Sequence, residues 1–342
     1  MHFKNNINFL RGLVLNKLFN ISTPLNVMFL ITNKCNLKCS YCDIPLRNQQ
    51  ELTTDEILKI VDNMASAGTQ RLSLLGGEPL LRTDIGEIIS RAKKHGMYVN
   101  IDSNGLLVKE NLDVITKLDL IILSFDGEKK VHDVNRGKGS YEKVVEALEI
   151  TPGYTKVMSL TLLNKKNIQS VPFILKKARE LKFTTLFQVP YHPEGVGSDS
   201  LSHLAADQEY REVFRYLLNE KKQGAPIAST TSYLKCLLNW PDYYKSHSTE
   251  KTLDCGKCFA GKLFCVMDVN GDLYTCCNYM GSISPPNALE LGFEKAFNRL
   301  GENLPGCKSC IGGAALESNL VFSPNLKAIW EWHLNTPQVK SN

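Results

Sequence analysis

Three cysteines lie close together in the stretch TNKCNLKCSYCD, which covers residues 32 to 43. Their spacing is C-x3-C-x2-C, with thiols at Cys35, Cys39 and Cys42, and no fourth cysteine is nearby in the sequence. Structural zinc sites and ordinary iron–sulfur ligand sets close with four protein ligands. Three thiolates on a four-iron cluster instead leave one iron open to an external ligand. The spacing therefore predicts a cluster with one exchangeable corner, and a structural zinc site is the alternative.

The elements that would position these thiols alternate along the chain as short apolar runs and amphipathic helical patterns. The apolar runs cover residues 27–31, 72–75, 97–101, 120–124, 157–163 and 186–189. Such near-continuous runs are typical of parallel strands that are covered on both faces. Helix signals lie between them, including a capping box at Thr53 and Glu56. Six such units predict an α/β fold, a partial (β/α)6 TIM-type barrel.

Polar or ligand-bearing segments directly follow the first four predicted strands. They are the cysteine triplet, GGEP at 76–79, SNG at 103–105 and SFDG at 124–127. In a parallel α/β fold the chemistry gathers at the carboxyl ends of the strands, so we expect these segments to meet at one rim. The segment after the sixth strand lies on the same rim, and its candidate substrate contacts are Tyr191, His192 and Glu194.

The alternation of strands and helices stops after about residue 206, where a long amphipathic helix begins. We therefore predict four parts. They are an N-terminal amphipathic segment (1–24), the barrel (25–225), a polar connector (226–249) and a small Cys-rich α+β C-terminal domain (250–342).

An aromatic residue, Tyr41, directly precedes the third cysteine, and GGEP comes after the next strand. With these features, residues 25 to about 220 resemble the radical S-adenosylmethionine (SAM) superfamily. The resemblance implies that the open iron of a [4Fe–4S] cluster binds the amine and carboxylate of SAM. It further implies that an electron from a flavodoxin- or ferredoxin-like donor cleaves SAM. The resulting 5′-deoxyadenosyl radical would then remove a hydrogen atom from an unidentified substrate.

The resemblance also assigns roles to residues on the predicted rim. It places Tyr41 against the adenine of SAM, and the SAM amine on Gly76, Gly77 and Glu78. It places contacts to the ribose at Ser103 and Asn104, and contacts to the carboxylate at Ser124 and Arg136. A guanidinium suits a carboxylate because it donates two parallel hydrogen bonds. A surface loop charge is the alternative for Arg136. His132 is expected to be a solvated loop residue, and neither His132 nor Asp126 is assigned a chemical role.

The later cysteines resemble the twitch domain, a shortened form of the SPASM domain. Twelve residues separate Cys258 from Gly271, four more precede Cys276, and Cys307-x2-Cys310 follows. The segment DVNGDLYTC also predicts a β-hairpin with an Asn-Gly turn. The resemblance implies that Cys258, Cys276, Cys307 and Cys310 hold one auxiliary [4Fe–4S] cluster suited to electron transfer.

Other cysteines leave alternatives open at this auxiliary site. Cys255 and Cys277 compete for the same corners, whereas Cys236 and Cys265 are expected to be buried thiols. Zinc ribbons usually space their cysteine pairs by roughly 15–20 residues, whereas 48 residues intervene here. The alternative to the cluster is still a zinc site of four thiolates, Cys255, Cys258, Cys307 and Cys310.

The predicted activity is reductive cleavage of SAM and hydrogen abstraction from a peptide, lipid or small molecule, with net oxidation favoured by the auxiliary cluster. One alternative is an adenosyl- or methyl-transferase that adds a fragment of SAM to its substrate. A non-catalytic iron–sulfur electron carrier is more remote, because it needs no GGEP segment. The first strand begins by residue 27, so we expect no leader-peptide-recognition domain before the barrel, which disfavours a peptide.

The formal net charge of +5, from 40 basic and 35 acidic residues, is too mild to indicate a nucleic-acid partner. Arg11 and Lys17 interrupt the apolar stretch FLRGLVLNKLFNIS, which argues against a signal peptide and a membrane span. We therefore expect a cytoplasmic protein with reduced thiols. The basic N-terminus predicts either a helix that covers the barrel end or peripheral contact with a membrane.

Overall fold

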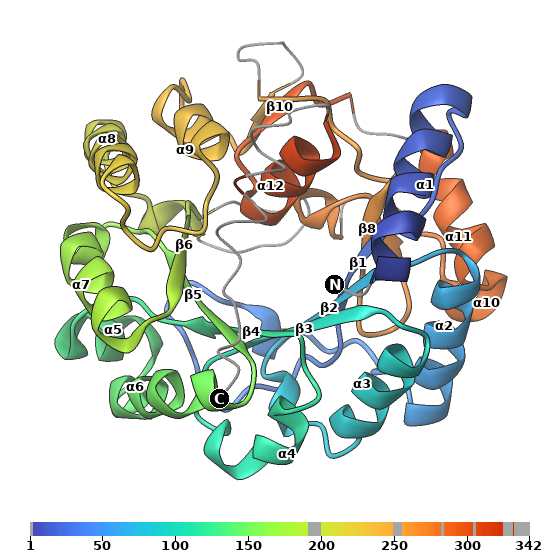
Figure 1. Ribbon diagram of the computed structural model, residues 1–342, viewed down its shortest axis with the longest axis horizontal. Coiled ribbons are helices and arrows are strands. Elements are labelled where there is room, and N and C mark those ends of the chain that lie inside the picture. The colour runs from blue at the N-terminus through green and yellow to red at the C-terminus, as the bar shows by residue number, and fades with distance from the viewer. Residues whose placement is uncertain are drawn as a thin grey trace.

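The computed structural model describes residues 3–190, 200–248, 255–281, 284–303 and 306–323, together with residue 331. A curved sheet with helices on its outer side dominates this part of the chain (Figure 1). The candidate substrate contacts Tyr191, His192 and Glu194 lie outside the described residues.

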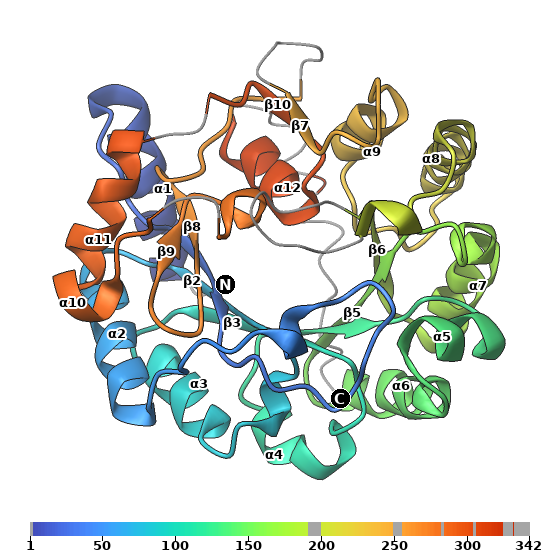
Figure 2. The same cartoon turned by 180° about the vertical axis from the view of Figure 1, so that it is seen from behind.

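Six parallel strands confirm the predicted alternation of strands and helices. They pair in chain order and are β1 (Asn26–Leu30), β2 (Arg71–Leu75), β3 (Tyr98–Ser103), β4 (Leu120–Ser124), β5 (Lys156–Leu162) and β6 (Thr184–Gln188). The sheet curves like the wall of a barrel but does not close (Figures 1 and 2). The fold is therefore the α/β partial TIM-type barrel that the sequence predicts.

Helices cover the outer face of this sheet. They are α2 (Thr54–Ser66), α3 (Ile85–Lys94), α4 (Leu112–Ile115), α5 (Lys129–Arg136), α6 (Ser140–Ile150) and α7 (Val171–Leu181). The predicted capping box before α2 is present, because the side chains of Thr53 and Glu56 each accept from the other's backbone amide. Val99 and Ile101 of β3 pack into the core that these helices share. Side chains alternate along a strand, so Asn100 and Asp102 face the concave side.

A hairpin from the C-terminal part of the chain extends the same sheet. β8 (Phe264–Met267) pairs in parallel with β1, and β9 (Leu273–Tyr274) pairs antiparallel with β8. The predicted hairpin is confirmed, and Gly271 takes the left-handed φ of +88° in its turn. Its addition to the barrel sheet is not predictable from sequence, because pairing between distant strands leaves no local pattern.

The remaining elements lie on the open side of the barrel and around its edge. They are α8 (Asp207–Lys222), α9 (Thr231–Leu238), β7 (His247–Ser248), α10 (Ala288–Leu291), α11 (Phe293–Leu300), β10 (Ser309–Cys310) and α12 (Gly313–Phe322). β7 and β10 form a small antiparallel sheet. The segment predicted as a polar connector contains α9 and two buried aromatic side chains, Trp240 and Tyr243. Residues 226–248 therefore pack as part of the fold.

A buried carboxylate fixes α12 to α9. Glu317 accepts hydrogen bonds from the Thr230 amide at 2.8 Å and from the Thr230 hydroxyl at 3.0 Å. Burial raises the pKa of Glu317 to about 7, although both bonds from Thr230 act against the rise. A side chain at Gly313 would collide with Gln188 of β6. The start of α12 therefore lies directly against the barrel wall.

One pair of cysteines departs from the sequence-based predictions. Cys236 and Cys255 form a disulfide, with Cα atoms 5.7 Å apart. The expectations of a buried thiol at Cys236, a competing ligand at Cys255 and fully reduced cysteines are therefore wrong, because the fold brings α9 next to residue 255. The zinc site that needs Cys255 is excluded with them. The other nine cysteines are thiols, and Cys265 is buried in β8 as expected.

The first helix, α1 (Phe3–Phe19), packs beside the C-terminal hairpin. Leu13 of α1 joins a hydrophobic cluster with Leu25 and with Phe264 and Val266 of β8. The segment is therefore a helix at the edge of the barrel. No helix in the described ranges is both long and apolar enough to cross a membrane.

Candidate functional site

The first three cysteines lie on the loop that follows β1. Cys35, Cys39 and Cys42 are thiols, and each is partly exposed. Burial raises the pKa of Cys39 to about 11, the Arg136 guanidinium acts against this rise, and the nearby thiols Cys42 and Cys35 add to it. Such mutual effects require sulfur atoms that lie near one another. The loop therefore brings its three thiols together.

Gly76 and Gly77 follow β2 at the point where its loop meets the cysteine loop. The Gly77 amide donates to the Thr32 carbonyl and the Glu78 amide to the Lys34 carbonyl, both at 2.8 Å. A Cβ at Gly76 would collide with the Thr32 oxygen, and a Cβ at Gly77 would collide with the Lys34 oxygen. The two glycines are therefore required because two backbones meet here without room for a side chain.

Replacement of Gly77 by alanine tests this close approach. We expect Gly77→Ala to displace the cysteine loop, to destabilise the fold by about 1–3 kcal/mol and to lower iron incorporation. Gly153→Ala is the matched control, since nothing lies within 4 Å of a Cβ at that position. Thermal unfolding and iron content per chain measure both variants. Equal behaviour of the two variants would contradict the steric role of Gly77.

The Glu78 carboxylate joins the loop after β2 to the loop after β3. It is fully buried and accepts from the Ser103 hydroxyl at 3.0 Å, the Asn104 amide at 2.8 Å and the Leu80 amide at 3.1 Å. Burial raises its pKa, and the bond from Asn104 opposes that rise most strongly. The Asn104 side chain in turn donates to the Cys35 sulfur at 3.9 Å. Glu78, Ser103 and Asn104 thus form one unit next to the cysteine loop.

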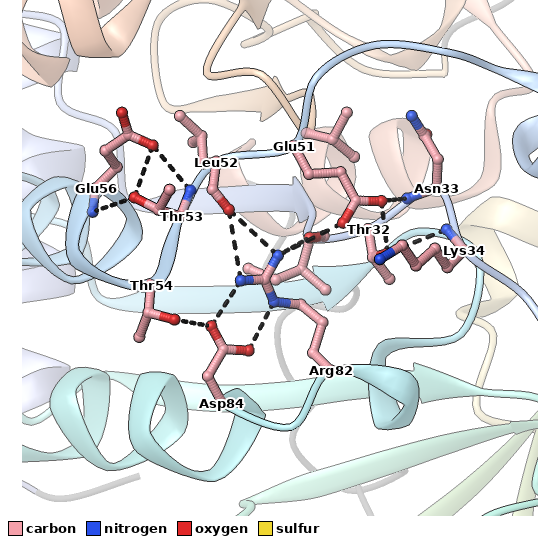
Figure 3. A network of polar contacts seen from close by, with 12 residues as sticks. Thr32, Asn33, Lys34, Glu51, Leu52, Thr53, Thr54, Glu56, Arg82 and Asp84 are labelled. Carbon is pink, nitrogen blue, oxygen red and sulfur yellow. Dashed lines mark hydrogen bonds and ion pairs between the residues drawn. The ribbon is translucent and has the colours of Figure 1, made fainter.

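A second polar network holds the start of the cysteine loop (Figure 3). Glu51 accepts from the Thr32 hydroxyl and from the Asn33 amide, both at 2.8 Å. Arg82 lies 3.8 Å from Glu51 and pairs with Asp84 at 2.6 Å. The segment before Cys35 is therefore tied to the segments before α2 and α3.

The far end of the cysteine loop is tied to the C-terminal hairpin. Arg47 forms an ion pair with Asp268, which is buried beside the hairpin turn. The Leu52 amide donates to the Val269 carbonyl at 2.9 Å. The two groups of cysteines therefore belong to parts of the chain that contact each other directly.

Tyr41, which is partly buried, forms a cluster with the buried side chains of Asp126 and Arg136 against the cysteine loop. Asp126 accepts from the Tyr41 hydroxyl at 3.0 Å and from the Arg136 guanidinium at 2.8 and 3.3 Å. Burial acts to lower the pKa of Arg136, but Asp126, Tyr41 and Cys39 together outweigh burial, and the pKa is raised. The surface-charge alternative for Arg136 is therefore wrong. Asp126, to which the sequence analysis assigned no chemical role, is fully buried in this cluster.

His132 is also buried, contrary to the expectation of a solvated loop residue. The Asp126 amide donates to its Nδ1 at 3.1 Å, which places the ring proton on Nε2. Burial lowers the pKa of His132 to about 4, so the ring is neutral near pH 7. On the same helix, Asn135 is buried with no hydrogen-bond partner for its side-chain amide among the described residues. Its carbonyl accepts from the Ser40 amide at 2.9 Å, within the cysteine loop.

Asp102 is a titratable residue on the concave face that the motif analysis missed. It directly precedes Ser103, and its Oδ1 accepts from the Asn100 side chain at 3.3 Å. Burial raises the pKa of Asp102 to about 7, although Arg71 acts against the rise. Ser124, the last residue of β4, is partly exposed on the same concave side. The alternation of apolar and polar residues in YVNIDS is the signal that could have identified Asp102.

The second group of thiols gathers near β9 and β10. The pKa of Cys310 is raised, mainly by burial and then by the neighbouring thiols Cys258, Cys277 and Cys307. The pKa of Cys276 is likewise raised, by burial and by the nearby thiols Cys277, Cys258 and Cys310. Five thiols therefore share this space, and Cys276 and Cys277 remain alternatives for one ligand position.

A four-iron cluster and a single metal ion require different arrangements of ligands. No three His, Cys, Asp or Glu side chains in the described ranges are arranged to hold one metal ion. A structural zinc site needs four ligands around one ion. A four-iron cluster takes each thiolate on a different iron atom, so its ligands need not converge on one point.

Comparison with known proteins gives one family match. Residues 29–178 match the family model described as the Radical SAM superfamily. PqqA peptide cyclase from Granulibacter bethesdensis is 27% identical over 235 residues, which cover 66% of this chain and 61% of that protein. Fe-coproporphyrin III synthase from Methanosarcina barkeri is 28% identical over 207 residues, which cover 58% of this chain and 51% of that protein. The chain thus spans less than two thirds of the length of either relative.

Among solved structures, Streptococcus suis SuiB bound to S-adenosylmethionine superposes with a TM-score of 0.66 at 17% identity. The match covers 84% of this chain and 69% of SuiB. At this level of identity the match shows that the fold is shared. The superposition includes more of the chain than the family match, because the C-terminal region contributes to it.

Proposed function

Because residues 29–178 match the Radical SAM superfamily model, we propose that this chain cleaves SAM reductively and oxidises a peptide substrate. The observation that carries the proposal is the contact between the cysteine loop and the unit formed by Glu78, Ser103 and Asn104. An electron carrier would not require these loops to meet at the open side of a three-thiol set.

Cys35, Cys39 and Cys42 would hold a [4Fe–4S] cluster, since three thiolates on one loop leave one iron open. When bound, this cluster and SAM supply an electron and a 5′-deoxyadenosyl radical, which takes a hydrogen atom from the substrate. The buried, unpartnered amide of Asn135 beside the loop supports the presence of a further group here, because buried polar groups are rarely left without a partner.

The chain's own side chains would orient SAM and exclude water from it. Tyr41 is held in place through its bond to Asp126, so its ring is fixed beside the third cysteine. Arg136 keeps its charge in this buried setting, because Asp126 compensates it. Ser124 completes the carboxylate-binding set that we propose with Arg136. Asn104 is positioned by Glu78 and offers its amide between Cys35 and the ribose site.

Net oxidation also requires that a proton leave the substrate. The Asp102 carboxylate lies on the concave face next to Ser103, and a pKa of about 7 suits proton transfer near neutral pH. The auxiliary [4Fe–4S] cluster would be held by Cys258, Cys307 and Cys310, together with either Cys276 or Cys277. When bound, that cluster supplies an electron acceptor. The thiols and Asp102 together support oxidation over transfer of a SAM fragment, which remains the second candidate.

The relatives support a peptide as the substrate class without excluding others. PqqA peptide cyclase carries a peptide substrate in its name, whereas Fe-coproporphyrin III synthase names a porphyrin product. A reducing partner such as a flavodoxin or ferredoxin completes the proposal. Comparison of extracts from a deletion strain with those of the parent would identify the substrate as a species that is heavier by two hydrogens.

Binding of SAM tests the proposed site directly. Glu78→Gln replaces one acceptor oxygen by a donor group, which cannot accept from the amide and hydroxyl donors that face it. Loss of a hydrogen bond to a charged group costs about 1.5–3 kcal/mol. We therefore expect SAM binding to weaken by about 10–100-fold.

Equilibrium binding under anaerobic conditions measures the affinity, and iron analysis of the same samples checks the cluster. Glu87→Gln is the control, because Glu87 is exposed on α3. Iron content should stay unchanged in both variants. Loss of iron together with SAM binding would show that Glu78 supports the fold of the loop and not the SAM site.

A further inference from the structure

The N-terminal helix α1 buries one side and leaves an apolar stripe on the other. On the buried side, Leu13 is 9% exposed, and the ring of Phe9 lies 5.6 Å from the ring of Phe322. Gly12 approaches Leu25 so closely that a Cβ would meet its side chain. This side fixes α1 to the body of the protein beside β8 and the end of α12.

The opposite side of α1 carries large apolar side chains that no other part of the described chain covers. Leu10, Val14, Leu18 and Ile21, which we call the α1 stripe, are 59%, 49%, 72% and 47% exposed. At about 100° per residue Leu10, Val14 and Leu18 lie within about 80° of arc on the helix, and Ile21 follows two residues after the end of α1.

The α1 stripe is also the densest group of exposed apolar residues. Of the eleven large hydrophobic side chains that are exposed in the described ranges, four belong to the α1 stripe. Single exposed apolar residues are common, but a contiguous group of them marks an interaction surface. The side chain of Asn16 donates to the Ile21 carbonyl at 3.1 Å, so the end of the stripe is held in place.

Basic side chains border the α1 stripe. Arg11 and Lys17 are exposed, and the helical repeat places one at each edge of the stripe. At the end of the helix, the Lys262 ammonium reaches the Asn20 side chain at 3.4 Å. Residues 1–42 contain no Asp or Glu. Apolar side chains flanked by cations match the boundary between acyl chains and anionic headgroups, because long basic side chains extend from the apolar layer to the charged one.

We propose that the α1 stripe docks this protein on the surface of a membrane that contains anionic lipids. Leu10, Val14 and Leu18 enter the boundary between headgroups and acyl chains, and Arg11 and Lys17 contact the headgroups. The contact of α1 with Leu25, directly before β1, would then hold the barrel at the membrane surface.

Sedimentation of the full-length protein with vesicles tests the proposal. The wild type should bind vesicles of phosphatidylcholine and phosphatidylglycerol, bind phosphatidylcholine alone more weakly, and be released as salt rises. The double variant Leu10→Gln, Leu18→Gln keeps good helix formers and should bind at least about 10-fold more weakly, since it removes two leucines that would be buried in the membrane. The double variant Arg11→Gln, Lys17→Gln should bind anionic vesicles with an affinity that is lower by roughly 5-fold for each charge removed. Its binding should also lose most of its dependence on salt.

Leu46→Gln is the matched control, because Leu46 is 77% exposed but lies outside α1. It should bind vesicles as the wild type does. A wild type that stays in the supernatant with both vesicle types would overturn the proposal, as would unchanged binding of the Leu10 and Leu18 variant. A concentration-dependent dimer that this variant abolishes, without vesicle binding, would also overturn it and would assign the stripe to contact between two copies of the chain.

Discussion

Cys39→Ala is expected to abolish the formation of 5′-deoxyadenosine from SAM. Cys39 is the middle thiol of the triplet, and its pKa responds to both other thiols. Without it, one more iron would lack a protein ligand, so the cluster should be lost or unable to orient SAM. Even changes beyond the direct ligands of a metal site cost about 10–100-fold in affinity or activity, and loss of a ligand should cost more. Liquid chromatography of reduced, reconstituted protein incubated with SAM measures the product.

Cys265→Ala is the matched control for this experiment. Cys265 is a buried thiol in β8 that belongs to neither group of ligands. It should retain SAM cleavage even if its loss slightly lowers the thermal stability. Product formation by Cys39→Ala at the wild-type rate would refute the assignment of the triplet.

The second large effect concerns the number of clusters. The wild type should hold about eight iron atoms per chain, the sum of two four-iron clusters. Replacement of Cys35, Cys39 and Cys42 by alanine together should reduce this to about four, because the second thiol group keeps its ligands. Iron and acid-labile sulfide analysis of the purified variant gives the count.

The outcome also decides the nature of the C-terminal site. Zinc in place of iron and sulfide in the triple variant would contradict an auxiliary cluster and remove the electron acceptor from the proposed oxidation. Three other thiols of the group raise the pKa of Cys310, so this residue lies among them. Replacement of Cys310 in the triple variant should therefore remove the remaining four irons.

The strands and the main motifs of this fold are predictable because they are local. Apolar runs identify all six barrel strands, and the Asn-Gly turn identifies the β8–β9 hairpin. The need for two glycines before Glu78 is visible only in the structure, where the Thr32 and Lys34 carbonyls occupy the space of a side chain.

The residues that sequence analysis misplaced depend on tertiary contacts. Asp126 and His132 lie in polar segments, which by themselves indicate solvated loops. Asp126 is buried because Tyr41, 85 residues before it in the chain, donates to the same carboxylate as Arg136, and the Asp126 amide in turn donates to His132 Nδ1. The disulfide of Cys236 with Cys255 likewise joins α9 to a segment whose path the sequence does not reveal.

The central claim is that the cluster held by Cys35, Cys39 and Cys42 binds SAM at its open corner. Electron paramagnetic resonance of the reduced wild type, recorded with and without SAM, tests it most directly. We predict that SAM changes the signal of the wild type and leaves the signal of the triple alanine variant unchanged, because a fully ligated cluster has no open iron. Identical wild-type spectra with and without saturating SAM would contradict the claim.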